Sequence, residues 1–147
     1  MKLVSYKTED REHLGVFVNG HIYNLNSCNK LIPDEMNAFL QGGDPLMERA
    51  KKINQEILDG TVKPKEEVFY EVLAPVPHPT SCRDGYAFRQ HVASARRNRK
   101  VDMIAEFDQY PIFYFTNHNS IQGPGKIICM PDHFKKLDFE LEVAIVI

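Results

Sequence analysis

The stretch that decides how this chain is read is Asp138-Phe139-Glu140-Leu141-Glu142-Val143-Ala144-Ile145-Val146-Ile147, whose composition is that of a β-strand. Side chains alternate between the faces of a strand, so one face would be wholly apolar and the other would carry Asp138, Glu140 and Glu142. The Cα atoms of residues two apart in a strand lie about 6.5–7 Å apart, so the carboxylates of two such residues can both reach one hard cation. The alternative is an edge strand with a solvated acidic face.

The last five residues, 143–147, form an uninterrupted apolar run without a turn residue or a polar tail. A strand of this kind needs partner strands on either side. We therefore expect the 147 residues to be the front part of a longer protein, with the partners supplied by later sequence.

Composition narrows the class of protein. Hydrophobic residues make up 43% of the chain and charged residues 26%, as in soluble globular proteins. The net charge of −2 argues against bulk attraction to nucleic acid or to an anionic membrane, and no apolar run approaches the ~20 residues of a membrane span. The start of the chain does not resemble a signal peptide, and three widely spaced cysteines indicate reduced thiols. We expect a cytoplasmic protein.

The first 70 residues predict a small α+β domain. Strands are expected at residues 2–7, 14–18 and 21–25, and Asn19-Gly20 is a strong hairpin signal between the last two. An amphipathic helix is expected at residues 45–58, because Leu46, Ala50, Ile53 and Ile57 share one helical face. A proline-rich connection follows, so we divide the chain into domains 1–70 and 71–147.

The segment from Ser81 to Lys100 allows three interpretations. A helix is predicted from about Tyr86, with Asp84 at its N-cap and His91 nearly two turns further on, on the same side. Asp84 could be only a cap and His91 a half-buried helix residue. The arginines and lysine that follow could instead bind phosphates or nucleic acid, although no other feature supports a nucleic-acid surface. Third, Asp84 could be a metal ligand and His91 a general base beside it.

Three pieces of the chain, taken in order, resemble the fumarylacetoacetate hydrolase family. The first is Asp84-Gly85-Tyr86 with Gln90-His91. The second is Pro111-Ile112-Phe113-Tyr114, within the stretch 111–115 that we expect to be a buried strand, with Asn119-Ser120-Ile121 and Gly123-Pro124-Gly125. The third is Leu137-Asp138-Phe139-Glu140-Leu141-Glu142-Val143-Ala144, which is similar to the family's Glu-x-Glu strand. The resemblance covers residues 75–147, and residues 1–70 fit the family's variable N-terminal domain.

The resemblance implies a fold and a site. The fold is a small N-terminal domain followed by a catalytic domain of rolled mixed β-structure, of which residues 71–147 would be the first part. A divalent cation, Mg²⁺ or Ca²⁺ with Mn²⁺ as a further candidate, would be held by Asp84, Glu140 and Glu142 and by an aspartate further along the chain. His91 matches the catalytic histidine, and a lysine and a glutamate that assist it in the family would also lie beyond Ile147.

The resemblance also implies substrate contacts and an activity. Tyr86 and Tyr114 match substrate-binding tyrosines, and Lys100 stands where animal-type members have an arginine, which leaves the substrate open. The implied protein is a homodimeric, metal-dependent hydrolase that cleaves a C–C bond in a β-diketone such as fumarylacetoacetate or an acylpyruvate, as in aromatic amino acid catabolism. The same scaffold could decarboxylate, isomerise or dehydrate a 2-oxo acid, or the chain could be a non-catalytic binding domain or an inert fragment. The expected partner is a small anionic diketo or oxo acid.

Overall fold

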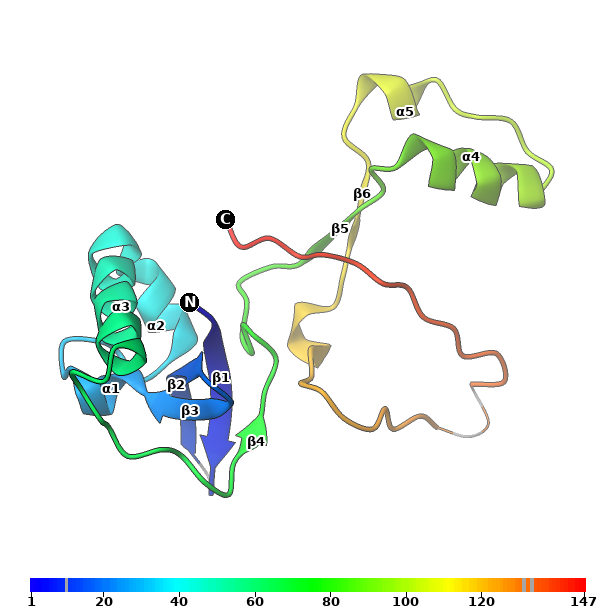
Figure 1. The fold of residues 1–147 in the computed structure, drawn as a ribbon. Helices are drawn as coiled ribbons and strands as arrows, with labels where there is room; N and C mark the ends of the chain where they lie inside the picture. Colours follow the sequence, from blue (N-terminus) through cyan, green and yellow to red (C-terminus); the bar gives the residue numbers. More distant parts are fainter. Residues whose placement is uncertain (10, 131, 133) are drawn as a thin grey trace.

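The structure is a computed structural model that describes residues 1–9, 11–130, 132 and 134–147. It is an α+β structure with two separate small sheets. Figure 1 shows a compact N-terminal domain, and after it an open arrangement built around a two-stranded ribbon. Within the described residues, no helix is both long enough and apolar enough to span a bilayer.

The N-terminal sheet is antiparallel and has the order β3-β2-β1-β4. Its strands are β1 (Leu3–Thr8), β2 (Arg11–Val18), β3 (His21–Asn24) and β4 (Glu71–Val72). The predicted hairpin between β2 and β3 is confirmed, because Val18 pairs with His21 around Asn19 and Gly20. Those two residues have φ angles of 50° and 93°, which the asparagine and glycine side chains tolerate.

Three helices follow the hairpin: α1 (Leu25–Cys28), α2 (Met36–Gln41) and α3 (Gly43–Leu58). Figure 1 shows α2 and α3 on one side of the sheet. Leu14 and Val16 of β2 pack there against Phe39 of α2 and against Ala50 and Ile53 of α3, and all five are buried. The expected amphipathic helix at 45–58 is therefore confirmed, with its apolar face in the domain core.

A polar network fastens the loop before α2 to the sheet. Asp34 lies 2.8 Å from Nδ1 of His13 through one carboxylate oxygen and accepts a 2.9 Å hydrogen bond from Asn24 through the other. Asn24 also donates to the hydroxyl of Tyr6 at 3.0 Å. Tyr6 is fully buried, and its burial raises the pKa of its hydroxyl far above the ordinary value of 10.0.

Residues just after 70 continue the N-terminal sheet. β4 pairs with β1, and the N–H of Leu73 donates to the carbonyl oxygen of Ser5 at 2.9 Å. The Ser5 hydroxyl then donates to the carbonyl oxygen of Pro75 at 2.9 Å, and Val76 packs on the helix-covered core. The packing of the N-terminal domain thus extends past residue 70, where the sequence suggested the change of domain.

The second part contains β5 (Arg83–Gly85) and β6 (Phe113–Phe115), which pair antiparallel. Between them lie α4 (Arg89–Asn98) and α5 (Glu106–Gln109), and the short 3₁₀ turn η1 (His118–Ser120) follows β6. The strand at 111–115 was expected to be buried, but the side chains of its three paired residues, 113 to 115, are 43%, 70% and 65% exposed. The expectation of burial is wrong because no further layer of the described residues covers the ribbon.

The C-terminal stretch differs most from expectation. Residues 138–147 form no strand, and Leu141, Val143 and Ile145 are 95%, 93% and 80% exposed. A strand exists only where its backbone groups join a ladder, and no described strand pairs with this stretch. The prediction of a strand here is wrong for this structure, and the described residues after 80 form a two-stranded ribbon rather than a rolled sheet.

One glycine fixes a contact between the two parts. A Cβ at Gly123 would lie 2.3 Å from the carbonyl oxygen of Val72 and 2.8 Å from the Cα of Leu73. Backbone atoms cannot yield as a flexible side chain can, so only glycine allows the loop after η1 to approach β4 this closely.

Candidate metal and acid–base site

Asp84 sits in the middle of β5, directly opposite Tyr114 of β6. The prediction that it caps the following helix is wrong, since α4 begins at Arg89 and its N-cap residue is Phe88. Asp84 and His91 therefore do not share a helix face. A short bend after β5 separates them, in which the N–H of Tyr86 donates to the carbonyl oxygen of Ile112 at 3.1 Å and extends the pairing of the ribbon.

His91 lies in the first turn of α4, beside the ring of Tyr86. The Tyr86 ring meets the imidazole edge to face at 5.9 Å between centroids, and it meets Phe107 edge to face at 6.2 Å. The other neighbour is acidic: Nε2 of His91 lies 4.0 Å from Oε1 of Glu140. The His91 side chain is 56% exposed, so it is open to solvent.

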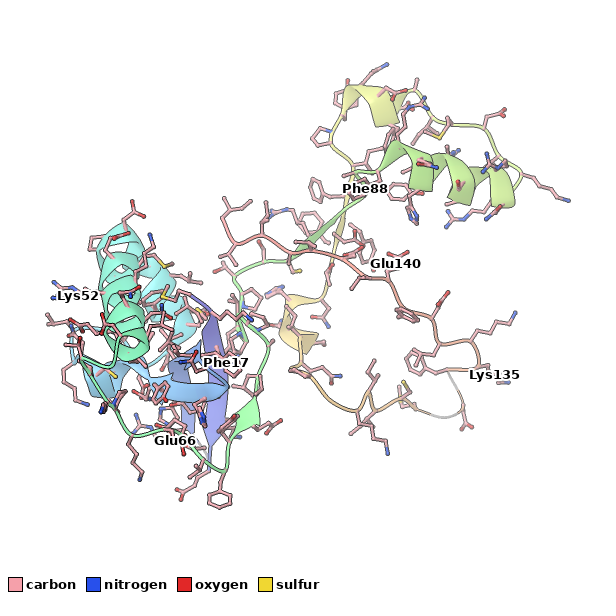
Figure 2. The ribbon with its side chains drawn as sticks, in the orientation of Figure 1. Phe17, Lys52, Glu66, Phe88, Lys135 and Glu140 are labelled. Carbon is pink, nitrogen blue, oxygen red and sulfur yellow. The ribbon has the colours of Figure 1, made fainter. Side chains whose placement is uncertain are left out.

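The C-terminal segment brings its glutamates to the ribbon and α4. Figure 2 shows Glu140 on this segment close to where the segment passes the ribbon. The pKa of Glu142 is raised above its ordinary value of 4.5, first by repulsion from the carboxylate of Asp84, then by desolvation and by Glu140, while His91 lowers it. Glu142 therefore lies in the field of both other acids and of the histidine.

The donor set suits a hard divalent cation, because all three acids offer carboxylate oxygens and their mutual repulsion is what a cation relieves. Their positions do not form a closed ligand shell. Within the part of the chain that the structure describes, no three His, Cys, Asp or Glu side chains have the arrangement of a metal site. The residues fit a cation by the chemistry of their oxygens, and the segment that carries Glu140 and Glu142 would have to tighten around it.

The two other predicted substrate contacts, Lys100 and Tyr114, lie at different distances from Asp84, Glu140 and Glu142. Lys100 follows the C-cap residue of α4, nine residues beyond His91, which corresponds to roughly 13–14 Å along a helix axis. It lines a shallow hollow of about 340 Å³ together with Arg96 and Arg97, so the structure does not bring Lys100 to the acids. Tyr114 is opposite Asp84 in the ribbon but is 70% exposed.

Sequence reasoning missed two contacts of this region. Arg89 at the start of α4 forms a two-pronged ion pair with Asp108 of α5, with distances of 3.1 and 3.3 Å. Arg83 lies over the rings of Phe113 and Phe115. Both contacts join residues 19 or more positions apart, so no local sequence spacing predicts them. For the contact of Arg83, the available signal was that Phe113 and Phe115 share one face of β6.

The second part of the chain is similar to a known protein family. Residues 80–147 match the family model described as fumarylacetoacetate (FAA) hydrolase C-terminal. The whole chain aligns with oxaloacetate tautomerase FAHD2A, mitochondrial, of Homo sapiens at 29% identity, and with oxaloacetate tautomerase fahd2, mitochondrial, of Xenopus laevis at 27%. It also aligns at 27% identity with fumarylacetoacetate hydrolase domain-containing protein 2 of Pongo abelii.

The alignments cover all of this chain but only 45%, 44% and 45% of the three relatives, in the order given. The chain thus spans a little under half the length of the curated relatives that it matches. The matched residues 80–147 contain Asp84, His91, Glu140 and Glu142, the four residues that the structure brings near one another. On this evidence residues 80–147, a little under half of the chain, are similar to the C-terminal domain of the fumarylacetoacetate hydrolase family.

Proposed function

We propose that this chain supplies the cation-binding and acid–base residues of an enzyme that acts on a small anionic diketo or 2-oxo acid through its enolate. One observation carries the proposal: Asp84 from β5, His91 from α4, and Glu140 and Glu142 from the C-terminal segment lie close enough for their charges to interact. Acids drawn together around a histidine are costly to assemble without a function, because like charges repel.

In this proposal Asp84, Glu140 and Glu142 hold Mg²⁺ or Ca²⁺. When bound, the cation supplies positive charge that stabilises the oxygen of an enolate. The acids would keep the cation beside His91, whose exposed imidazole a substrate can reach from solvent. Tyr86 orients the imidazole through its edge-to-face contact.

The role proposed for His91 is that of general base. In the hydrolytic reaction it takes a proton from water, the water oxygen attacks a carbonyl carbon, and the adjacent C–C bond breaks. The electron pair of that bond becomes the enolate of the departing fragment, which is then protonated. An imidazole suits this task because it can accept and return a proton near neutral pH.

A second activity is favoured by the relatives, two of which carry the name oxaloacetate tautomerase in human and frog. For oxaloacetate, His91 would take a proton from the carbon between the two carbonyl groups and return it to the enolate oxygen, or run the same transfer in reverse. The C–H bond is exchanged for an O–H bond while the C=O bond becomes C–O and the neighbouring C–C bond becomes C=C, and no C–C bond is broken. The same acids and base serve both reactions, so the substrate decides between them.

The remaining proposals concern binding. Tyr114 and Tyr86 would contact the substrate from the ribbon side, and Lys100 with its neighbouring arginines would attract the anion rather than touch it from its present position. Assembly as a homodimer is proposed from the family resemblance.

The test uses the protein as expressed from its natural gene, with Mg²⁺ present. Its turnover of acylpyruvates, measured by loss of diketone absorbance, is compared with its acceleration of the enol–keto conversion of oxaloacetate. His91→Ala should reduce the active reaction by ~10²–10⁴-fold, and His118→Ala is the matched control in a turn with no place in the mechanism. Cleavage of acylpyruvate supports the hydrolase, and conversion of oxaloacetate alone supports the tautomerase. Full activity of His91→Ala would remove the proposed mechanism.

A further inference from the structure

We propose that Arg83 is a positioning residue that holds the β5–β6 ribbon in the register that pairs Asp84 with Tyr114, on the face opposite to Arg83. The proposal rests on the proposed cation-binding role of Asp84. Arg83 itself would touch neither cation nor substrate, because neighbouring residues on a strand project to opposite faces.

The contacts of Arg83 lie on the far face of the ribbon. Its guanidinium carbon is 5.4 Å from the centroid of the Phe113 ring and 5.1 Å from that of Phe115. The two rings meet edge to face at 5.2 Å. One Nη atom also donates a 3.2 Å hydrogen bond to the hydroxyl of Ser81. A single side chain of β5 thus engages both aromatic residues that flank Tyr114 on β6.

The ribbon has little else to fix its register. Its strands share only three residue pairs, Arg83–Phe115, Asp84–Tyr114 and Gly85–Phe113. One backbone hydrogen bond extends the ladder at each end, from Tyr86 to Ile112 and from Thr116 to Cys82. The side chains of 113 to 115 are exposed, so burial of a face does not select the register as it does in the N-terminal sheet.

A slip of one residue would have a definite cost for the site. Side chains alternate between the two faces of a strand, and directly opposed residues share a face. A slip of one residue therefore places Arg83 or Gly85, instead of Asp84, opposite Tyr114. Asp84 would then lose its place opposite Tyr114 and share the face of the Phe113 and Phe115 rings. In the observed register the Arg83 guanidinium pairs with both rings at once, whereas a slip places the rings and the guanidinium on opposite faces.

Solution NMR on the 147-residue chain tests the register directly. The end hydrogen bonds make Gly85 and Phe113 a non-hydrogen-bonded pair, in which the Cα atoms approach to about 4.5 Å and an Hα–Hα Overhauser effect is expected. Arg83→Met removes the charge and keeps the apolar stem, and Arg83→Lys keeps the charge. Arg49→Met is the matched control, since Arg49 is an exposed arginine on α3.

We expect Arg83→Met to lose the Gly85–Phe113 effect and to lower the exchange protection of the Tyr114 amide about tenfold, as the loss of two cation–π contacts implies. Arg83→Lys should retain most of both signals, and Arg49→Met should match the parent chain. The amide shifts of β2 report on the N-terminal domain and should stay fixed. If they move in Arg83→Met, Arg83→Gln takes its place in the comparison.

An unchanged Overhauser effect in Arg83→Met, or its absence in the parent chain, would overturn the proposal. A Mg²⁺ titration of the same variants separates this result from the proposed function. Lost register with weakened Mg²⁺ binding supports both roles. Lost register with unaltered Mg²⁺ binding supports the role of Arg83 in the ribbon and counts against Asp84 as a ligand.

Discussion

Replacing Glu142 by glutamine should have opposite effects on the ribbon and on cation binding. Without a cation, the ionised Glu142 is repelled by Asp84 and Glu140, which is why its pKa is raised. A carboxyl group whose pKa is higher in the folded chain opposes folding once it is ionised, so this cost grows as the pH rises through the raised pKa. At neutral pH Glu142→Gln should therefore increase the exchange protection of the β5–β6 amides.

In the presence of a cation, the charge of Glu142 is favourable and its removal should weaken cation binding. Glu142 is solvent exposed, so a water-like dielectric applies. The attraction between a dication and one carboxylate at about 4 Å is then worth roughly a 30-fold change in affinity. Isothermal titration with Mg²⁺ or Mn²⁺ should show this weakening in Glu142→Gln. The affinity of the parent chain should also fall as the pH is lowered through the raised pKa of Glu142, because the proton then competes with the cation.

The control is Glu106→Gln, which removes an exposed acid from the start of α5 and should leave the affinity unchanged. If Glu142 had only a structural role, its replacement by glutamine would not both stabilise the cation-free ribbon and weaken cation binding. If Glu142→Gln binds the cation as tightly as the parent chain, the assignment of this cluster as a cation site is wrong. The same holds if the parent chain shows no saturable binding.

Three further predictions concern the base, the domain contact and the N-terminal core. Turnover by the natural protein should fall ~10²–10⁴-fold in His91→Ala with Mg²⁺ affinity little changed, and a comparable loss of affinity would make His91 a ligand instead. Gly123→Ala should push its loop off β4, seen as faster exchange of the Leu73 amide with the α3 amides unaffected; unchanged exchange would show that the contact is absent in solution. The burial that raises the pKa of Tyr6 stabilises the folded domain below about pH 10, and this stability is lost as the pH rises above it; the raised pKa of the half-buried Cys28 thiol acts in the same direction. Tyr6→Phe should thus flatten the alkaline loss of unfolding free energy measured by urea denaturation, unlike Tyr23→Phe, and an equally steep loss in both would contradict the burial of Tyr6.

The N-terminal fold follows from short-range patterns. Asn19 and Gly20 specify the turn between β2 and β3, and the spacing of Ala50 and Ile53 specifies the buried face of α3. These signals operate within a few residues, where the covalent chain already limits the possible structures. The polar network around Asp34 was not predicted, because it joins His13 and Asn24 to a loop through side chains whose spacing has no regular period.

In the candidate site, the order of residues along the whole chain was informative and local spacing was not. The identity of its residues was expected from their order along the chain, and the structure brings His91 and Glu140 to 4.0 Å although 49 positions separate them in sequence. The local reasoning that linked Asp84 to His91 failed, because a helix was extended backwards over residues that pair with β6. Cross-strand pairing at 83–85 depends on Phe113 to Phe115, which no window around Asp84 contains.

The C-terminal stretch shows why alternation alone does not produce a strand. Phe139 and Leu141 alternate with Glu140 and Glu142 as a half-buried strand requires, yet both apolar side chains are almost fully exposed. Alternation states which residues would share a face, whereas the ladder and the layer that make the face must come from other segments. In a β-ladder, Glu140 and Glu142 would be fixed on the face opposite Leu141. In the irregular segment, Glu142 interacts with Asp84 only through charge. The repulsion that raises the pKa of Glu142 and the uncovered apolar side chains beside it therefore have one physical origin, a segment whose two faces both need a partner.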